Sequence, residues 1–230
     1  MPTDKRLLQI CGILCLTILL LTVWSTRFVP MQDLPQHLFM AWLANHHADP
    51  ALGLSEYFEL RGQLGPYRAS FLLQRLLESL AGIEFAAKVM VSLYLALVFC
   101  LLLKTQAETR GRHLAWGALL LVPASFHPMY FYGFLNFTLS IPLLMLSLYD
   151  LRSMLIHPQT RLGRTRQCAW VLALFLVHPY TLLVYIVLAT VTIALPGWAG
   201  GRVRPAVGVF AAVALFAARA QQARKAFVLL

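Results

Sequence analysis

Long apolar runs alternate with short polar or basic segments along the chain. The first run covers residues 7–24 and is 18 residues long. A helix of this length measures about 27 Å, which nearly matches a hydrocarbon core of roughly 30 Å. A signal peptide is the alternative, but the run exceeds an ordinary signal-peptide core and no small-residue cleavage site follows it. We therefore expect a retained membrane-spanning helix.

Five further apolar runs are candidate crossings. They are residues 85–103, 114–129, 134–151, 168–195 and 205–218. With the first run, they predict an all-α integral membrane protein with six transmembrane helices in one polytopic domain over residues 1–230. Pro179 lies near the centre of the long run 168–195. We expect one tilted crossing that is kinked at this proline, and a pair of half-helices is the alternative.

The charge pattern indicates how the chain is oriented. Hydrophobic residues make up 60% of the chain, and the formal net charge is +10. The basic residues lie between apolar runs and form no single stripe, which argues for topology signals and against nucleic-acid binding. The segment 67–82 carries charges that are costly at the bilayer centre, so we place it along the interface. Twelve of the nineteen cations then share the side of the N-terminus, which predicts a cytoplasmic N-terminus.

Residues 25–84 form the expected first external loop, which is far longer than the other connections. The loop contains six of the nine acidic residues. Apolar residues recur at helical spacing in two parts of it. We therefore expect two interfacial helices, at about residues 34–46 and 67–80, lying on the outer leaflet.

Asp33 is the candidate catalytic group. It follows the first span and directly precedes Leu34, Pro35 and Gln36. This order is typical of a helix N-cap, which is a structural role, although a cap also holds a carboxylate rigidly at the membrane surface. His37 lies four residues later on the same helical face, where it could orient the carboxylate or share a metal. An interfacial histidine that faces headgroups is the alternative for His37.

Two arginines and three other polar side chains are candidate substrate-binding groups. They are Arg61, Arg68, His127, Asn136 and His178. The arginines could grip a lipid phosphate bidentately, or they could anchor in the headgroups without a part in catalysis.

The other three candidates lie in later segments. His127 and Asn136 belong to the second external loop and could act as polar ligands, whereas the aromatic residues at 130–132 also fit an interfacial belt. On a kinked helix, His178 would lie at depth, where an ionisable group normally faces a cavity or a partner. Alternatively, it could bond a carbonyl that Pro179 leaves free.

Several short segments, taken in order, resemble a known superfamily. The first span is followed by an acid, then by Gly-Pro-Tyr at 65–67, Ala-Ala-Lys-Val at 86–89 and Leu-Val-Pro at 121–123. This arrangement resembles the bacterial GT-C membrane glycosyltransferases, which use polyprenyl-phosphate-linked sugar donors. The resemblance covers most of the chain and rests on order and spacing. Since such proteins usually have more spans, it implies an N-terminal portion or a truncated relative.

The resemblance implies sugar transfer at the external face of a bacterial inner membrane. Asp33 would act as a base toward the acceptor or would orient acceptor and metal, and the partners would be membrane lipid and a polyprenyl phosphate sugar donor. Residues 127–136 contain no acid, so the carboxylate pair that would bind a divalent metal is missing there. Metal use and oligomeric state stay open. The rival is a non-catalytic membrane subunit or a transporter module on the same scaffold.

Overall fold

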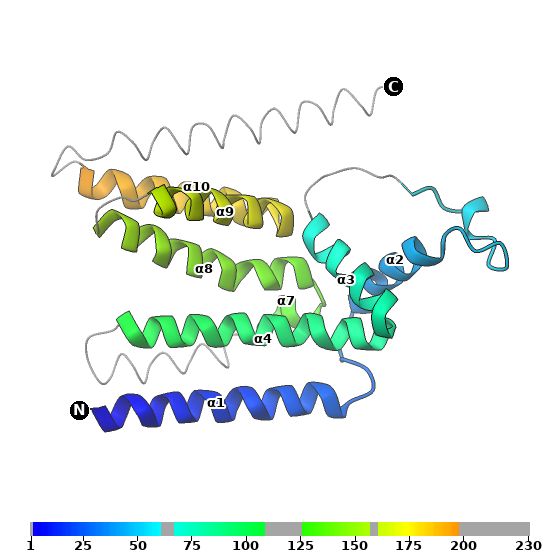
Figure 1. The fold of residues 1–230 in the computed structure, drawn as a ribbon, viewed down its shortest axis with the longest axis horizontal. Coiled ribbons are helices and arrows are strands. Elements are labelled where there is room, and N and C mark those ends of the chain that lie inside the picture. The colour runs from blue at the N-terminus through cyan, green and yellow to red at the C-terminus, as the bar shows by residue number, and fades with distance from the viewer. Residues whose placement is uncertain (1, 61–66, 109–125, 157–160, 198–230) are drawn as a thin grey trace.

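The computed structural model describes residues 2–60, 67–108, 126–156 and 161–197 (Figure 1). Every element in these ranges is helical, which confirms the predicted all-α fold class for this part of the chain. Arg61, most of the expected span 114–129 and all of 205–218 lie outside the described residues. The elements are α1 (Pro2–Ser25), α2 (Leu34–His46), η1 (Leu54–Glu56), α3 (Arg68–Ala81), α4 (Ile83–Glu108), α7 (Pro128–Phe131), α8 (Leu135–Ile156), α9 (Arg161–Val177) and α10 (Pro179–Gly197).

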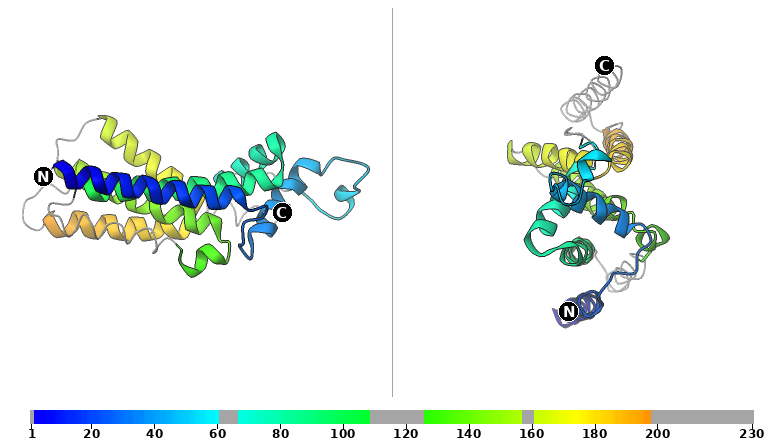
Figure 2. Two further views of the ribbon diagram at one scale, coloured as in Figure 1. Left: turned by 90° about the horizontal axis from the view of Figure 1, so that it is seen from below. Right: turned by 90° about the vertical axis from the view of Figure 1, so that its right-hand side faces the viewer.

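The long helices α1, α4, α8, α9 and α10 form an elongated bundle. α1 packs against α4, and α8 packs against α4, α9 and α10. The shorter helices α2 and α3 pack on each other and on α4 at the end of the bundle opposite the N-terminus (Figure 1). An end-on view shows them lying over that end (Figure 2). We call it the α2–α3 end.

The two helices expected in the first loop are confirmed. α2 spans Leu34–His46, as its apolar spacing predicts, and α3 spans Arg68–Ala81, one residue later than predicted. Gly82 ends α3 with a φ of 85°, a conformation that favours glycine. The chain can therefore turn from α3 into α4 within a single residue.

The set of six crossings is not supported by the described helices. By length and composition, one of them can cross a membrane, namely Ile83–Gln106 within α4. The apolar stretches Gln9–Ser25 of α1 and Pro179–Ile193 of α10 are shorter. Charged residues shorten the apolar part of the others, because α8 carries Asp150 and α9 begins with Arg161.

The expected single kinked crossing over 168–195 is wrong. The chain forms two helices, α9 and α10, which meet at His178 and lie side by side. The Tyr185 hydroxyl donates a 2.6 Å hydrogen bond to Oε1 of Gln167. In one continuous helix, these residues would lie about 27 Å apart. Pro179 supplies the reason, since it ends α9 but is well tolerated in the first turn of α10.

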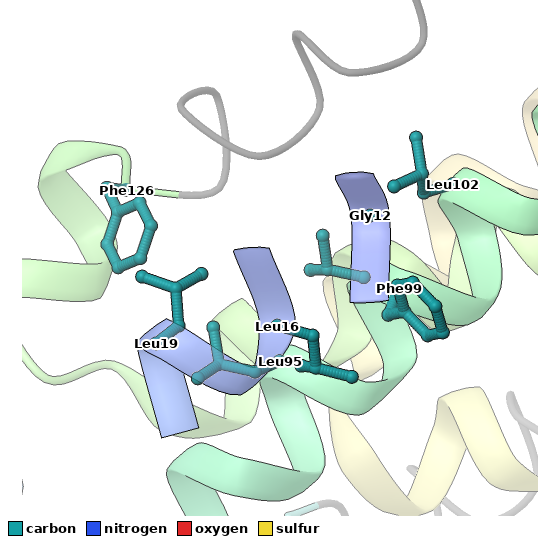
Figure 3. A pocket seen from close by; sticks show the side chains of 8 residues that line it. Gly12, Leu16, Leu19, Leu95, Phe99, Leu102 and Phe126 are labelled. Carbon is teal, nitrogen blue, oxygen red and sulfur yellow. The ribbon is translucent and has the colours of Figure 1, made fainter. Parts of the chain in front are cut away.

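Two apolar clusters fill the bundle. The first joins α2, α4 and the start of α8 around Leu34, Met90 and Leu135, and the second joins α8, α9 and α10 around Leu151 and Leu174. Between α1 and α4 lies a cavity of about 20 Å³ with apolar walls (Figure 3). Such a space is roughly the size of one water molecule, so it is a packing gap and not a substrate site.

Candidate functional site

The loop before α8 fixes the backbone at the start of α2. The N–H of Gln32 donates to the carbonyl of Phe131 at 3.0 Å, and the N–H of Asp33 donates to the carbonyl of Tyr132 at 2.8 Å. Consecutive hydrogen bonds of this kind leave little freedom to either segment. The residue expected to be catalytic and the second expected external loop are therefore joined directly.

Gly133 makes this junction sterically feasible. Its φ is 83°, and a Cβ atom built on it would lie 2.6 Å from the backbone nitrogen of Leu34 and 2.9 Å from that of Asp33. A residue with a side chain would strain its own backbone and collide with the start of α2. The close approach of the two segments therefore requires glycine at this position.

The Asp33 side chain does not cap α2. Asp33 occupies the N-cap position, and Pro35 lies in the first turn, but the carboxylate makes no capping hydrogen bond. Within the described residues, it also has no ion-pair partner. The capping role that the sequence pattern suggests is therefore not the role of this side chain. The carboxylate is half-buried and can contact another group.

His37 lies one turn after Asp33, as the spacing predicts. Its backbone N–H donates to the Asp33 carbonyl at 3.3 Å. Burial lowers the pKa of the His37 imidazole, and the nearby Asp33 carboxylate offsets part of this effect. A neutral imidazole beside a carboxylate can orient it or accept a proton.

A second group of candidate residues gathers around Phe137, in the first turn of α8. The His178 ring packs edge-on against Phe137 at 5.2 Å and against Tyr67 at 5.2 Å, both measured between ring centroids. The ring of His127 lies 6.5 Å from Phe137. The structure thus brings His127 and His178 to the same aromatic side chain, although they lie far apart in the sequence.

The kinked helix expected around His178 is not formed. Because α9 and α10 are separate helices, His178 lies at their junction, near the first turns of α3 and α8. Its Nδ1 lies 3.1 Å from the Thr181 hydroxyl, which in turn lies 2.7 Å from the Ser140 hydroxyl. The side chain is therefore partnered by a hydroxyl chain and not by a carbonyl that the proline leaves free.

Asn136 ties this second group to α3. The Ser70 hydroxyl donates a hydrogen bond to the Asn136 side-chain oxygen, and Ser70 is almost fully buried. Tyr67, which precedes α3, has a φ of 69°, which is an uncommon conformation for a bulky residue. Strain of this kind is often found at functional sites, and here the strained residue packs its ring against His178.

Of the two candidate arginines, the structure describes only Arg68. Arg68 follows Tyr67, and its guanidinium lies 5.5 Å from the centroid of the Phe71 ring. Arg61 lies outside the described residues. The structure therefore links His127 and His178 through Phe137, bonds Asn136 to Ser70 of α3, and joins the Asp33 backbone to Tyr132 in the loop before α8.

Sequence reasoning did not single out Phe137, Ser70 or Thr181, and it noticed Tyr67 only within a short segment. No local pattern marks these residues, because each acquires its role through a partner on another element. It also missed a part-buried group of polar side chains, a clamp between α2 and α3. There, the Asn45 amide donates to the Glu78 carboxylate, and Nε of Arg75 donates to Oδ1 of Asn45 at 2.9 Å.

The described side chains offer no obvious metal site. In the part of the chain that the structure describes, no three His, Cys, Asp or Glu residues gather closely enough to hold a metal ion. Nε2 of His127 is buried and has no hydrogen-bond partner among the described residues, and burial lowers the pKa of its ring. Among the described residues, the groups available at this end of the bundle are therefore the Asp33 carboxylate, imidazole rings whose pKa burial lowers, and aromatic faces.

Comparisons with known proteins leave the chain without an assigned family. No protein family, curated protein or solved structure matches it.

Proposed function

We propose that the chain is a helical membrane protein whose long helices lie across a bacterial inner membrane, with the α2–α3 end at the external face. Large apolar side chains point outward along two of these helices. On α1, they include Ile10, Ile18 and Leu21, and on α10 they include Leu183 and Val187. Apolar surface of this extent is uncommon on proteins in water and is typical of a lipid-facing wall. In this proposal, α2 and α3 are interfacial helices.

We further propose that the protein transfers a sugar from a polyprenyl phosphate carrier, as the GT-C resemblance implies. The supporting observation is Asp33, whose backbone is fixed at the start of α2 and whose carboxylate is not used for capping. Such a carboxylate can take a proton from an acceptor hydroxyl without first breaking a capping hydrogen bond. The neighbouring imidazole of His37 would orient it, and His127, Asn136 and His178 would contact the substrate.

The test is sugar transfer by purified full-length protein in proteoliposomes with a panel of polyprenyl phosphate sugar donors. Asp33→Asn should lower the turnover by about 100-fold or more, because a general base contributes roughly that factor. Its thermal stability should stay unchanged, since the replaced carboxylate caps nothing. Full activity of Asp33→Asn would contradict the proposed role of Asp33.

A non-catalytic membrane subunit or transporter module is the second candidate. It is favoured by the missing second acid, since residues 127–136 hold no carboxylate, and by the absence of a metal-binding cluster among the described residues. Absence of transfer by the unmodified protein with every donor of the panel would favour this function.

A further inference from the structure

The helix α3 has its polar side buried and its apolar side exposed. Ser70, Gln74 and Glu78 lie one turn apart along one face and are 3%, 2% and 7% exposed. Leu72, Leu76 and Leu80 lie along the opposite face and are 51%, 56% and 69% exposed. In a helix on the surface of a water-soluble protein, this pattern is reversed.

Specific partners hold α3 in this orientation. Glu78 accepts a hydrogen bond from Asn45 of α2, and Ser70 donates one to Asn136 of α8. Leu73 and Leu77, beside the exposed leucines, pack against the apolar cluster around α4. Rotation of α3 to hide the exposed leucines would leave a buried carboxylate without its partner, which is costly.

The end of α3 lies at the level where the apolar parts of α1 and α4 end. Leu80 is separated from Glu84 by one short turn, and the Glu84 carboxylate accepts a 3.1 Å hydrogen bond from Arg27, just after α1. At the same level, the Lys88 ammonium lies 5.7 Å from the centre of the Trp24 ring. Tryptophan and cationic side chains are enriched where a membrane meets water.

We propose that the face formed by Leu72, Leu76 and Leu80, the α3 leucine face, docks into the lipid of the outer leaflet. The occupant is lipid, because α1 and α10 also expose large apolar side chains, and because the end of α3 lies at the level of Trp24 and Lys88. An amphipathic helix at this level buries its apolar side in the boundary between headgroups and acyl chains. The proposal rests on the proposed membrane location and not on sugar transfer.

Depth-dependent fluorescence quenching tests the proposal. Leu72→Cys, Leu76→Cys and Leu80→Cys are made singly in the full chain after Cys11, Cys15, Cys100 and Cys168 are replaced by alanine. Each is labelled with bimane and reconstituted into nanodiscs of phosphatidylcholine and phosphatidylglycerol that carry a spin-labelled lipid. Ser55→Cys on the exposed element η1 is the aqueous control, and Ile18→Cys on α1 is the lipid control.

We expect lipid quenching at the three leucine positions to be at least about twofold stronger than at position 55, as for a face buried in the interface. Quenching by aqueous iodide should show the opposite order. Strong iodide quenching at 72, 76 and 80 would mean that the face lies in water, and protection from both quenchers would mean that a second copy covers it. Either result would overturn the proposal.

The control at Ile18 separates this proposal from the one on which it rests. If position 18 also escapes the lipid quencher, the proposed membrane location fails, and the leucine face fails with it. If position 18 is quenched and the three leucine positions are not, the leucine face alone fails.

Should the cysteine-free background not fold, photolabelling of the unmodified chain with a lipid-soluble diazirine gives the same comparison between residues 72–80 and residue 55.

Discussion

The backbone N–H of Asp33 donates a 2.8 Å hydrogen bond to the carbonyl of Tyr132, which joins the start of α2 to the loop before α8. These two residues lie far apart in the sequence. Local helix-forming signals determine that α2 begins at Leu34, but this long-range bond determines where its first turn lies. The position of the Asp33 carboxylate therefore depends on the conformation of residues 131–133.

Replacement of Gly133 tests this dependence. In Gly133→Ala, the new Cβ atom would lie 2.6 Å from the Leu34 backbone nitrogen. An alanine with the φ of 83° found at this position would also be strained. The loop has to move away from α2, at a cost of about 2–4 kcal/mol in the free energy of unfolding. We expect a lower thermal midpoint in detergent and, in a protein that transfers sugar, a loss of turnover.

Gly53→Ala is the matched control for this change. Gly53 also has a positive φ, of 60°, but no described atom lies within 4 Å of a Cβ atom placed there. The substitution should cost about 1–2 kcal/mol from backbone strain alone and should leave turnover unchanged. Equal losses of stability in the two variants would show that the contact between Gly133 and Leu34 is unimportant.

Acid should destabilise the fold through His37 and His127. Burial lowers the pKa of both rings from the ordinary 6.5. Below pH 6.5, the unfolded chain therefore binds protons that the folded chain does not, so the free energy of unfolding decreases as the pH falls. We expect the thermal midpoint to drop between about pH 7.5 and about pH 5.5. The double variant His37→Gln/His127→Gln should show a shallower drop, and an unchanged slope would contradict this assignment.

The antiparallel arrangement of α9 and α10 can be tested through Tyr185. Tyr185→Phe removes the hydroxyl that donates to Gln167 and leaves a buried amide oxygen without its donor. The expected loss is about 1–3 kcal/mol in the free energy of unfolding. Tyr57→Phe, at a ring that is 80% exposed, should have little effect. A double-mutant cycle with Gln167→Leu should give a clear coupling energy, which would be zero if α9 and α10 formed one continuous helix.

The fold was predictable where a local pattern determines the structure. The apolar spacing after Asp33 and Pro35 predicts α2 with its observed bounds, because helical periodicity and the preference of proline for the first turn act over a few residues. The run 168–195 was misinterpreted because a local pattern does not determine how two consecutive helices pack. Its hydropathy is continuous across His178, and hydropathy alone does not distinguish a kink from a tight turn between two antiparallel helices.

The candidate site was also predictable only where its residues are close in the sequence. His37 lies beside Asp33 because four residues make about one helical turn. The contacts of Tyr67 and Phe137 with His178, in contrast, depend on how three helices pack, and one sequence contains no signal for that packing. The same limit applies to the clamp between Asn45 and Glu78, since each residue looks like an ordinary polar position on an amphipathic helix.

The last prediction concerns the side of the membrane on which each end of the bundle lies. Lys104, Arg152 and Arg166 belong to helix ends remote from the α2–α3 end, whereas Asp49 and Glu56 lie in the long segment between α2 and α3. Positive charge favours the cytoplasmic side, so the α2–α3 end should be external.

In the cysteine-free background, Ala51→Cys should react with a membrane-impermeant maleimide in intact cells, whereas Ser153→Cys should react only after permeabilisation. Both must react in detergent, which shows that each thiol is accessible. Rapid labelling of Ser153→Cys together with protection of Ala51→Cys in intact cells would reverse the orientation, and labelling of both would contradict a bundle that crosses the membrane.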